Sequence, residues 1–159
     1  MKRGLFIAVS LLSLAVKLCS NAAAETHVSL RPVLDAPKDS EKISVTINGT
    51  KEDLLVQKHP LLNEKQFRLA EVTLVPEHLA AGPTLEIPLT ADGQTKLREW
   101  SQANVGHKLA LFVDGKFISA PMVVETLESP SFRVFGLERE QVLALYKDFT
   151  GAKQIPAGF

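Results

Sequence analysis

Cysteine is almost absent from this sequence, since Cys19 is the only one among 159 residues. Cys19 lies in an N-terminal segment that we expect to be removed, so the mature chain would have no thiol, no disulfide and no cysteine ligand for a metal. The sequence also lacks a Gly-x-Ser-x-Gly nucleophile elbow and a glycine-rich phosphate loop. No motif supports catalysis, and we expect neither enzymatic activity nor a cofactor.

Metal-ligand spacing is missing as well. No histidine has a second histidine four positions away or an acid at the spacing that metal sites use. We therefore expect no metal site in the folded chain. The histidines are His27, His59, His78 and His107.

Long apolar runs are absent except at the N-terminus. Lys2 and Arg3 precede an apolar run of 12 residues, Leu5–Val16, and three alanines follow at Ala22–Ala24. This order is typical of a secretory signal peptide, and the run is shorter than the roughly 20 residues of a membrane-spanning helix. We predict cleavage after Ala24 and export to the periplasm.

Two alternatives to a cleaved signal peptide stay open. The segment 1–24 could be retained as an anchor, although Lys17 interrupts its apolar run. It could also be cut before Cys19 and lipidated, although lipoprotein signals have small residues where this chain has Lys17 and Leu18. We favour cleavage without a lipid and expect no stable membrane span afterwards.

Excess positive charge is missing too. The chain has 18 basic and 18 acidic residues, and loss of Lys2, Arg3 and Lys17 would leave 15 bases against 18 acids. A nucleic-acid partner would need clustered positive charge, so we expect none. The predicted division is a signal peptide at 1–24, N-terminal strands at 25–53, one domain at 54–151 and a tail at 152–159.

Hydrophobic periodicity predicts an α+β fold, with an antiparallel sheet and two main helices packed on it. Helical spacing of apolar residues covers 90–105, where Trp100 is expected in the core, and 138–149. Shorter apolar or alternating segments predict strands near 27–34, 43–47, 54–57, 71–75, 84–89, 108–113, 116–124 and 131–135.

A hairpin is predicted where Asp114-Gly115 separates two apolar runs, because both positions of a tight two-residue turn need positive φ. The second arm contains Pro121, which has no N–H for a sheet ladder. We interpret Ser119-Ala120-Pro121 as a break that turns Met122 and Val123 to a different face. If this arm is an exposed sheet edge, Pro121 would also leave one fewer N–H donor with which another chain could pair and aggregate.

Three stretches carry a resemblance to a known family. They are residues 54–72 (LLVQKHPLLNEKQFRLAEV), 89–97 (LTADGQTKL) and 104–121 (NVGHKLALFVDGKFISAP). Together with Phe135-Gly136 and the glutamate-rich helix start that follows, they resemble the head of the first large periplasmic domain of the bacterial translocase subunit SecD. The resemblance covers about residues 54–149 and includes the Pro121 arm.

The resemblance implies a binding function, because the SecD head is thought to contact unfolded polypeptide during export. SecD also has several membrane helices and a smaller base domain, which we do not expect in this chain, so the resemblance extends only to the head. We expect a freestanding exported module with a protein or polypeptide partner. The expected contact residues are Ile118, Ser119, Ala120, Pro121, Met122 and Val123, on an edge that can accept an added strand.

Two other functions remain open at this point. The same head fold could bind one folded partner in the cell envelope. A hydrolase is the third alternative, because acids such as Asp114, Glu125 and Glu128 could converge in the fold.

Overall fold

The computed structural model describes residues 26–47, 49–76, 79–80, 82–156 and 159. The predicted signal peptide, with Cys19, therefore lies outside the described residues. The strands are β1 Val28–Pro32, β2 Ser40–Ile47, β3 Thr50–Gln57, β4 Thr73–Val75, β5 Thr84–Pro88, β6 Leu109–Val113, β7 Lys116–Ser119 and β8 Ser131–Val134. The helices are α1 Ala91–Ala103 and α2 Arg139–Thr150, with short 3-10 turns η1 Glu64–Gln66 and η2 Leu69–Glu71.

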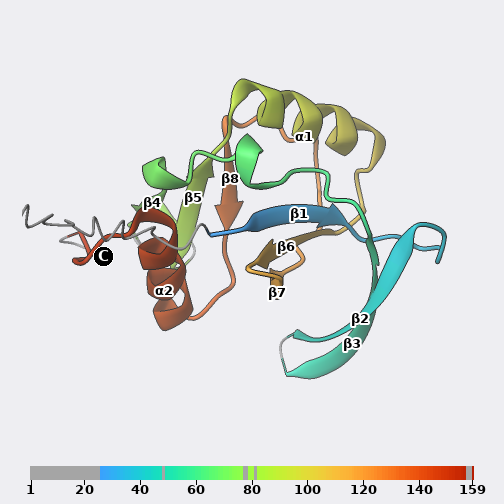
Figure 1. The fold of residues 1–159 in the computed structure, drawn as a ribbon, viewed down its shortest axis with the longest axis horizontal. Coiled ribbons are helices and arrows are strands. Elements are labelled where there is room, and N and C mark those ends of the chain that lie inside the picture. The colour runs from blue at the N-terminus through green and yellow to red at the C-terminus, as the bar shows by residue number, and fades with distance from the viewer. Residues whose placement is uncertain (1–25, 48, 77–78, 81, 157–158) are drawn as a thin grey trace, which may run out of the picture.

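All strand pairs are antiparallel, which confirms the predicted α+β class, but the strands form three sheets. Their orders are β1-β6-β7, β2-β3 and β4-β5-β8 (Figure 1). α2 lies near one end of the long axis and the β2–β3 ribbon near the other (Figure 1). β7 and β8 are therefore both edge strands, each with one neighbour in its sheet.

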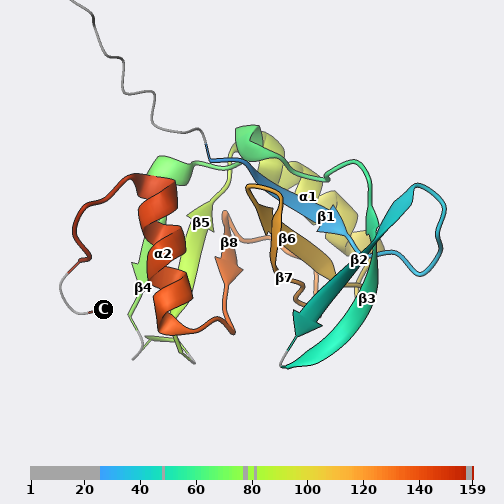
Figure 2. The same cartoon turned by 60° about the horizontal axis from the view of Figure 1, so that its bottom comes forward.

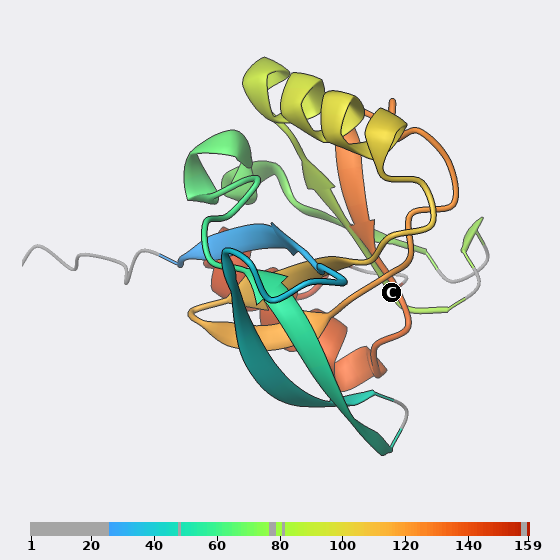
Figure 3. The ribbon, with the colours of Figure 1, turned by 90° about the vertical axis from the view of Figure 1, so that its right-hand side faces the viewer.

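β6 is buried along its whole length because both of its faces are covered. Leu109, Leu111 and Val113 belong to the main core, which the two three-stranded sheets and both helices share. Ala110 and Phe112 belong to a second cluster under the β2–β3 ribbon, which lies across the sheet in Figure 3. A strand buried on both faces reads as a continuous apolar run, which is the pattern of residues 109–113.

Both predicted helices are present, although α1 ends at Ala103 with Asn104 as its C-cap, two residues before the predicted end. The Thr90 side chain accepts a hydrogen bond from the Gly93 N–H (3.2 Å) and caps α1. Glu138 and Gln141 form a reciprocal capping box at the start of α2, and Gly151 ends it with φ +65°. α2 then runs beside β4 and β5 (Figure 2).

Trp100 is less buried than the sequence predicted. It packs against the main core but keeps part of its surface exposed, whereas Leu97, one turn earlier, is buried. The helical stripe was correctly placed, but its large aromatic lies at the margin of the buried face. Leu97 is the main core residue of α1.

The Asp114-Gly115 turn is confirmed, with φ +48° at Asp114 and +74° at Gly115. Both values lie in the left-handed region that a two-residue turn of this kind requires. The Asp114 carboxylate also accepts the His27 N–H (2.9 Å), and the Asp114 N–H donates to the His27 carbonyl (2.8 Å). The turn is thereby joined to the start of β1.

The interpretation of Pro121 as a break in the ladder is only partly right, because β7 ends at Ser119 but its register continues beyond the proline. Leu111 opposes Ser119, and the Leu109 N–H donates to the Pro121 carbonyl (3.0 Å). Lys108 then pairs with Met122 in an isolated antiparallel β-bridge. The same register therefore continues past the proline. The irregularity lies earlier, where the register shifts between Leu111 and Phe112 and one extra residue of β7 is accommodated. Such a bulge disrupts the ladder locally and bends the strand.

Candidate functional site

The second arm of the hairpin, residues 116–124, which we call the arm, lines two hollows with several residues each. It reaches a third hollow, of about 530 Å³, only with Met122. The first of the two is the α2 cleft, between the hairpin and α2. Its lining residues are Val113, Asp114, Lys116, Phe117, Ile118, Leu137, Gln141, Ala144, Leu145 and Asp148, and its volume is about 270 Å³.

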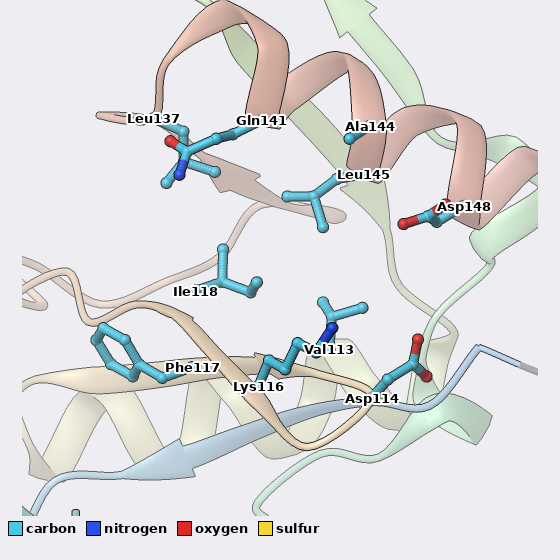
Figure 4. Close-up of a pocket in the computed structure, with 10 residues that line it drawn as sticks. All are labelled: Val113, Asp114, Lys116, Phe117, Ile118, Leu137, Gln141, Ala144, Leu145 and Asp148. Atoms are coloured by element: carbon cyan, nitrogen blue, oxygen red, sulfur yellow. The ribbon is translucent and has the colours of Figure 1, made fainter. Parts of the chain in front are cut away.

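The α2 cleft has an apolar middle and an acidic end. Ile118 and Leu145 project into it from opposite sides, and Asp114 and Asp148 lie at the same end (Figure 4). That end is engaged by the N-terminal segment of the chain, because Asp114 accepts the His27 N–H and the Asp148 carbonyl accepts the Thr26 hydroxyl (3.1 Å). The chain itself therefore satisfies part of the polar rim of this cleft.

The second hollow is the β8 groove, between β8 and the distal part of the arm. Its volume is about 410 Å³, and its lining residues are Leu97, Leu109, Pro121, Met122, Val123, Val124, Glu125, Leu127, Ser129, Ser131, Phe132, Arg133 and Phe135. Three of these are large apolar side chains that face solvent: Met122 is 56% exposed, Val124 76% and Phe135 60%. The floor, in contrast, is made of core residues such as Leu97 and Leu109.

Hydrogen bonds fix the arm side of the β8 groove. The Gly106 N–H donates to the Val123 carbonyl (2.7 Å), and the Val123 N–H donates to the His107 carbonyl (2.8 Å). Further along, the Leu127 N–H donates to the hydroxyl of buried Ser101 on α1 (2.9 Å). Hydrogen bonds therefore fix the position of the arm on one side of the groove, and β8 forms the other side.

The structure divides the predicted contact residues between the two hollows. Ile118 lines the α2 cleft, whereas Pro121, Met122 and Val123 line the β8 groove. Ser119 and Ala120 are half-buried and line neither. Val123 is only 4% exposed and belongs to the core, so Met122 is the one of the six with a largely exposed side chain.

Sequence reasoning missed Phe135 as a groove residue, and it placed Val124 only at the end of the expected binding edge, Ile118–Val124. Phe135 could have been found, because alternation in 131–135 placed Phe132 and Val134 on one face and left Phe135 with Arg133 on the other. The groove itself could not be found, because it joins residues 121–125 to a strand that the intervening loop brings beside them.

Two carboxyl groups with shifted pKa values lie outside both hollows. Hydrogen bonds from Lys42 and Ser44 lower the pKa of Asp53, and hydrogen bonds from Lys96 and Gln66 lower the pKa of Asp92. Both acids are exposed on the surface. Within the described ranges, no three His, Cys, Asp or Glu side chains cluster in a way that could hold a metal ion.

None of the helices in the described part of the chain is long and apolar enough to cross a membrane.

A search of curated proteins finds no match. The solved structures do include similar folds, among them three structures of SecDF. One, described as a membrane component that enhances protein export, aligns with a TM-score of 0.57 at 18% identity over 83% of this chain and 69% of that chain.

Two further SecDF crystal structures agree. SecDF in its super-membrane-facing form aligns with a TM-score of 0.59 at 19% identity, over 79% of this chain and 18% of that one. SecDF from Thermus thermophilus, a translocon-associated membrane protein, aligns with a TM-score of 0.54 at 18% identity, over 80% of this chain and 20% of that one. The TM-scores establish a shared fold, and this chain spans about a fifth of the chains in these last two structures.

The family model for the P1 head subdomain of SecDF matches residues 39–145, which is more than half of the sequence. The match begins just before β2 and ends within α2, so it includes both hollows apart from Asp148. Sequence resemblance, family match and shared fold agree, and the chain belongs to the SecDF P1 head subdomain family.

Proposed function

We propose that this protein is an exported, non-catalytic binding module whose β8 groove contacts unfolded or extended polypeptide. The observation that carries the proposal is the exposed apolar group Met122, Val124 and Phe135 around a groove of about 410 Å³. Contiguous apolar surface beside a concave site is typical of a place where a partner binds.

The groove suits polypeptide in particular. Its floor and walls are mostly aliphatic and aromatic, which favours apolar side chains of many shapes over one specific small molecule. Its polar groups, Glu125, Ser129, Ser131 and Arg133, lie among these apolar residues. A surface of this kind binds a peptide through buried apolar area and main-chain hydrogen bonds, and it selects only modestly among the side chains of that peptide.

The family supports a protein partner, since a related structure is described as a component that enhances protein export. A role in export requires the chain to reach the periplasm, so the proposal includes the signal peptide at 1–24 with cleavage after Ala24. Intact-mass analysis of the protein from cells should give an N-terminus at Glu25. Retention of residues 1–24, or a lipid on Cys19, would contradict this part.

A competition assay tests the binding function. A fluorescently labelled exported polypeptide, kept unfolded, should bind the purified protein, and unlabelled unfolded competitor should displace it. The same competitor after folding should displace it at least tenfold less well. Stronger displacement by the folded form would favour the alternative of one folded envelope partner, and no binding of either form would overturn the proposal.

A further inference from the structure

The backbone of β8 has unused hydrogen-bonding groups beside the β8 groove. β8 pairs with β5 in an unbroken antiparallel register, and the Leu89 N–H donates to the Pro130 carbonyl (2.9 Å) one step before β8 begins. Bonded and non-bonded pairs alternate in such a ladder, so Phe132 bonds to β5 and Arg133 turns its N–H and C=O to the other side. No described residue donates to or accepts from these two groups of Arg133.

The hydrogen bonds of β5 agree with this assignment. The Pro88 carbonyl accepts the Arg68 N–H (2.9 Å), so the backbone of Pro88 faces away from β8. Pro88 opposes Ser131, which makes that pair non-bonded and Ser131, like Arg133, outward-facing. The Ser131 N–H is satisfied locally by the Ser129 hydroxyl (3.3 Å), which leaves Arg133 as the central open position of the edge.

We propose that β8 accepts an extended segment of the client polypeptide as an added strand, with an acidic residue of that segment opposite Arg133 and apolar residues on either side of it. This inference rests on the proposed function and specifies how the β8 groove would bind. Strand addition satisfies the open N–H and C=O of Arg133 whatever the client's sequence is.

Charge complementarity selects the residue opposite Arg133. In the sheet, Thr73 opposes Glu86 and Glu86 opposes Arg133, whose guanidinium lies 3.5 Å from the Glu86 carboxylate. An acid on the added strand would continue this alternation of charge across the exposed face. A second copy of the chain pairing symmetrically about Arg133 would instead place two arginines opposite each other, which disfavours a dimer.

The residues next to that acid would point to the other face, because side chains alternate along a strand. Phe132 points to that face of β8, and it lines the groove together with Val123 and Leu97. Apolar side chains of the client would therefore enter the groove while its acid stays at the surface. The preferred segment has an acidic or polar residue between two apolar ones.

N-methylated peptides test the backbone pairing. The probe is a fluorescent, end-capped peptide of alternating Val and Thr with one central Glu in place of a Thr. Methylation of the Glu nitrogen removes the N–H that would bond to Arg133 and adds bulk there, so we expect at least a tenfold weaker Kd. Methylation of a neighbouring Val nitrogen, which would face away from β8, should change Kd less than threefold.

A charge exchange tests the register. Replacement of the central Glu by Lys should weaken binding about two- to fivefold, the range for an exposed ion pair. In the Arg133→Glu variant this preference should reverse. Circular dichroism and melting temperature confirm that the variant is folded before its Kd values are compared.

The outcomes separate this inference from the proposed function. If unfolded polypeptide binds but both methylated peptides lose affinity equally, or charge preference does not reverse, strand addition to β8 is overturned while the binding function stands. If no unfolded polypeptide binds, the proposed function itself fails. If the protein is a dimer that a crosslinker at Arg133 joins through two β8 strands, the occupant is a second copy and the inference is also overturned.

Discussion

The α2 cleft and the β8 groove differ although each borders an edge strand of a three-stranded sheet. In the α2 cleft, the large apolar residues are buried in the core clusters or packed against them, and the edge strand has a bulge. The chain's own Thr26 and His27 bond to the acidic end. In the β8 groove, the edge strand is regular and three large apolar side chains face solvent. Whether a strand edge is available for binding therefore depends on what packs beside it.

The largest expected effect is on stability in the α2 cleft. Leu145 is buried in the main core, so Leu145→Ala should lower the free energy of unfolding by about 2–5 kcal/mol, which urea denaturation measures. Peptide affinity of the folded fraction should stay within twofold of wild type. A stable Leu145→Ala protein with much weaker peptide binding would make the α2 cleft the binding site.

The turn between the arms should tolerate change less than the groove surface does. Gly115→Val places a β-branched residue at φ +74°, where an L-residue costs about 1–2 kcal/mol and a branched one more. Nothing lies within 4 Å of the added Cβ, so the cost would come from the backbone alone. Melting at the wild-type temperature would show that the turn does not need positive φ.

Substitutions in the β8 groove should weaken binding and leave stability nearly unchanged, which is the opposite of the expectation for Leu145→Ala. Met122→Ser with Phe135→Ser should weaken binding of unfolded polypeptide at least tenfold, about 1.4 kcal/mol. Because both side chains are more than half exposed, stability should change by no more than about 1 kcal/mol.

Leu79→Ser is the matched control for that double variant, because Leu79 is 70% exposed and lies outside the groove. It removes an apolar surface side chain without touching the proposed site, and affinity should stay within twofold. Equal losses in the control and the double variant would mean that binding follows general surface hydrophobicity.

Pro121→Ala should have the smallest effect. Pro121 lies at a bonded position opposite Leu109, so the new N–H would point into the ladder toward the Leu109 carbonyl. The added hydrogen bond, about 0.5–1.5 kcal/mol, and the greater freedom of the unfolded chain, about 0.4–1 kcal/mol, nearly cancel.

This expectation replaces the idea that Pro121 protects an open edge. The variant should remain as monomeric as the wild type in sedimentation experiments. Concentration-dependent association of Pro121→Ala alone would restore the protective role.

Local chemistry made much of the fold predictable. The Asp114-Gly115 turn and the two helices depend on residues a few positions apart, and all three are present. The pairing of β1 with β6 joins residues about 80 positions apart, and that of β5 with β8 joins residues more than 40 apart, which periodicity does not encode. The bulge in β7 likewise leaves no signal of its own in the sequence.

The candidate site was predictable only in part for the same reason. The arm was identified from its resemblance and its proline, but exposure within it varies from residue to residue. Met122 faces solvent and Val123 the core because strand alternation continues through Pro121. Phe135 joins Met122 only after the loop between the arm and β8 has folded back.

Site-specific crosslinking tests the central claim most directly. A photoreactive group is placed at Met122 in the β8 groove or, as the comparison, at Gln141 in the α2 cleft, and each protein is mixed with an exported polypeptide in unfolded or folded form. The account predicts strong labelling of the unfolded polypeptide from position 122, little from position 141, and little of the folded form from either. Stronger labelling from position 141, or equal labelling of folded and unfolded polypeptide from position 122, would contradict it.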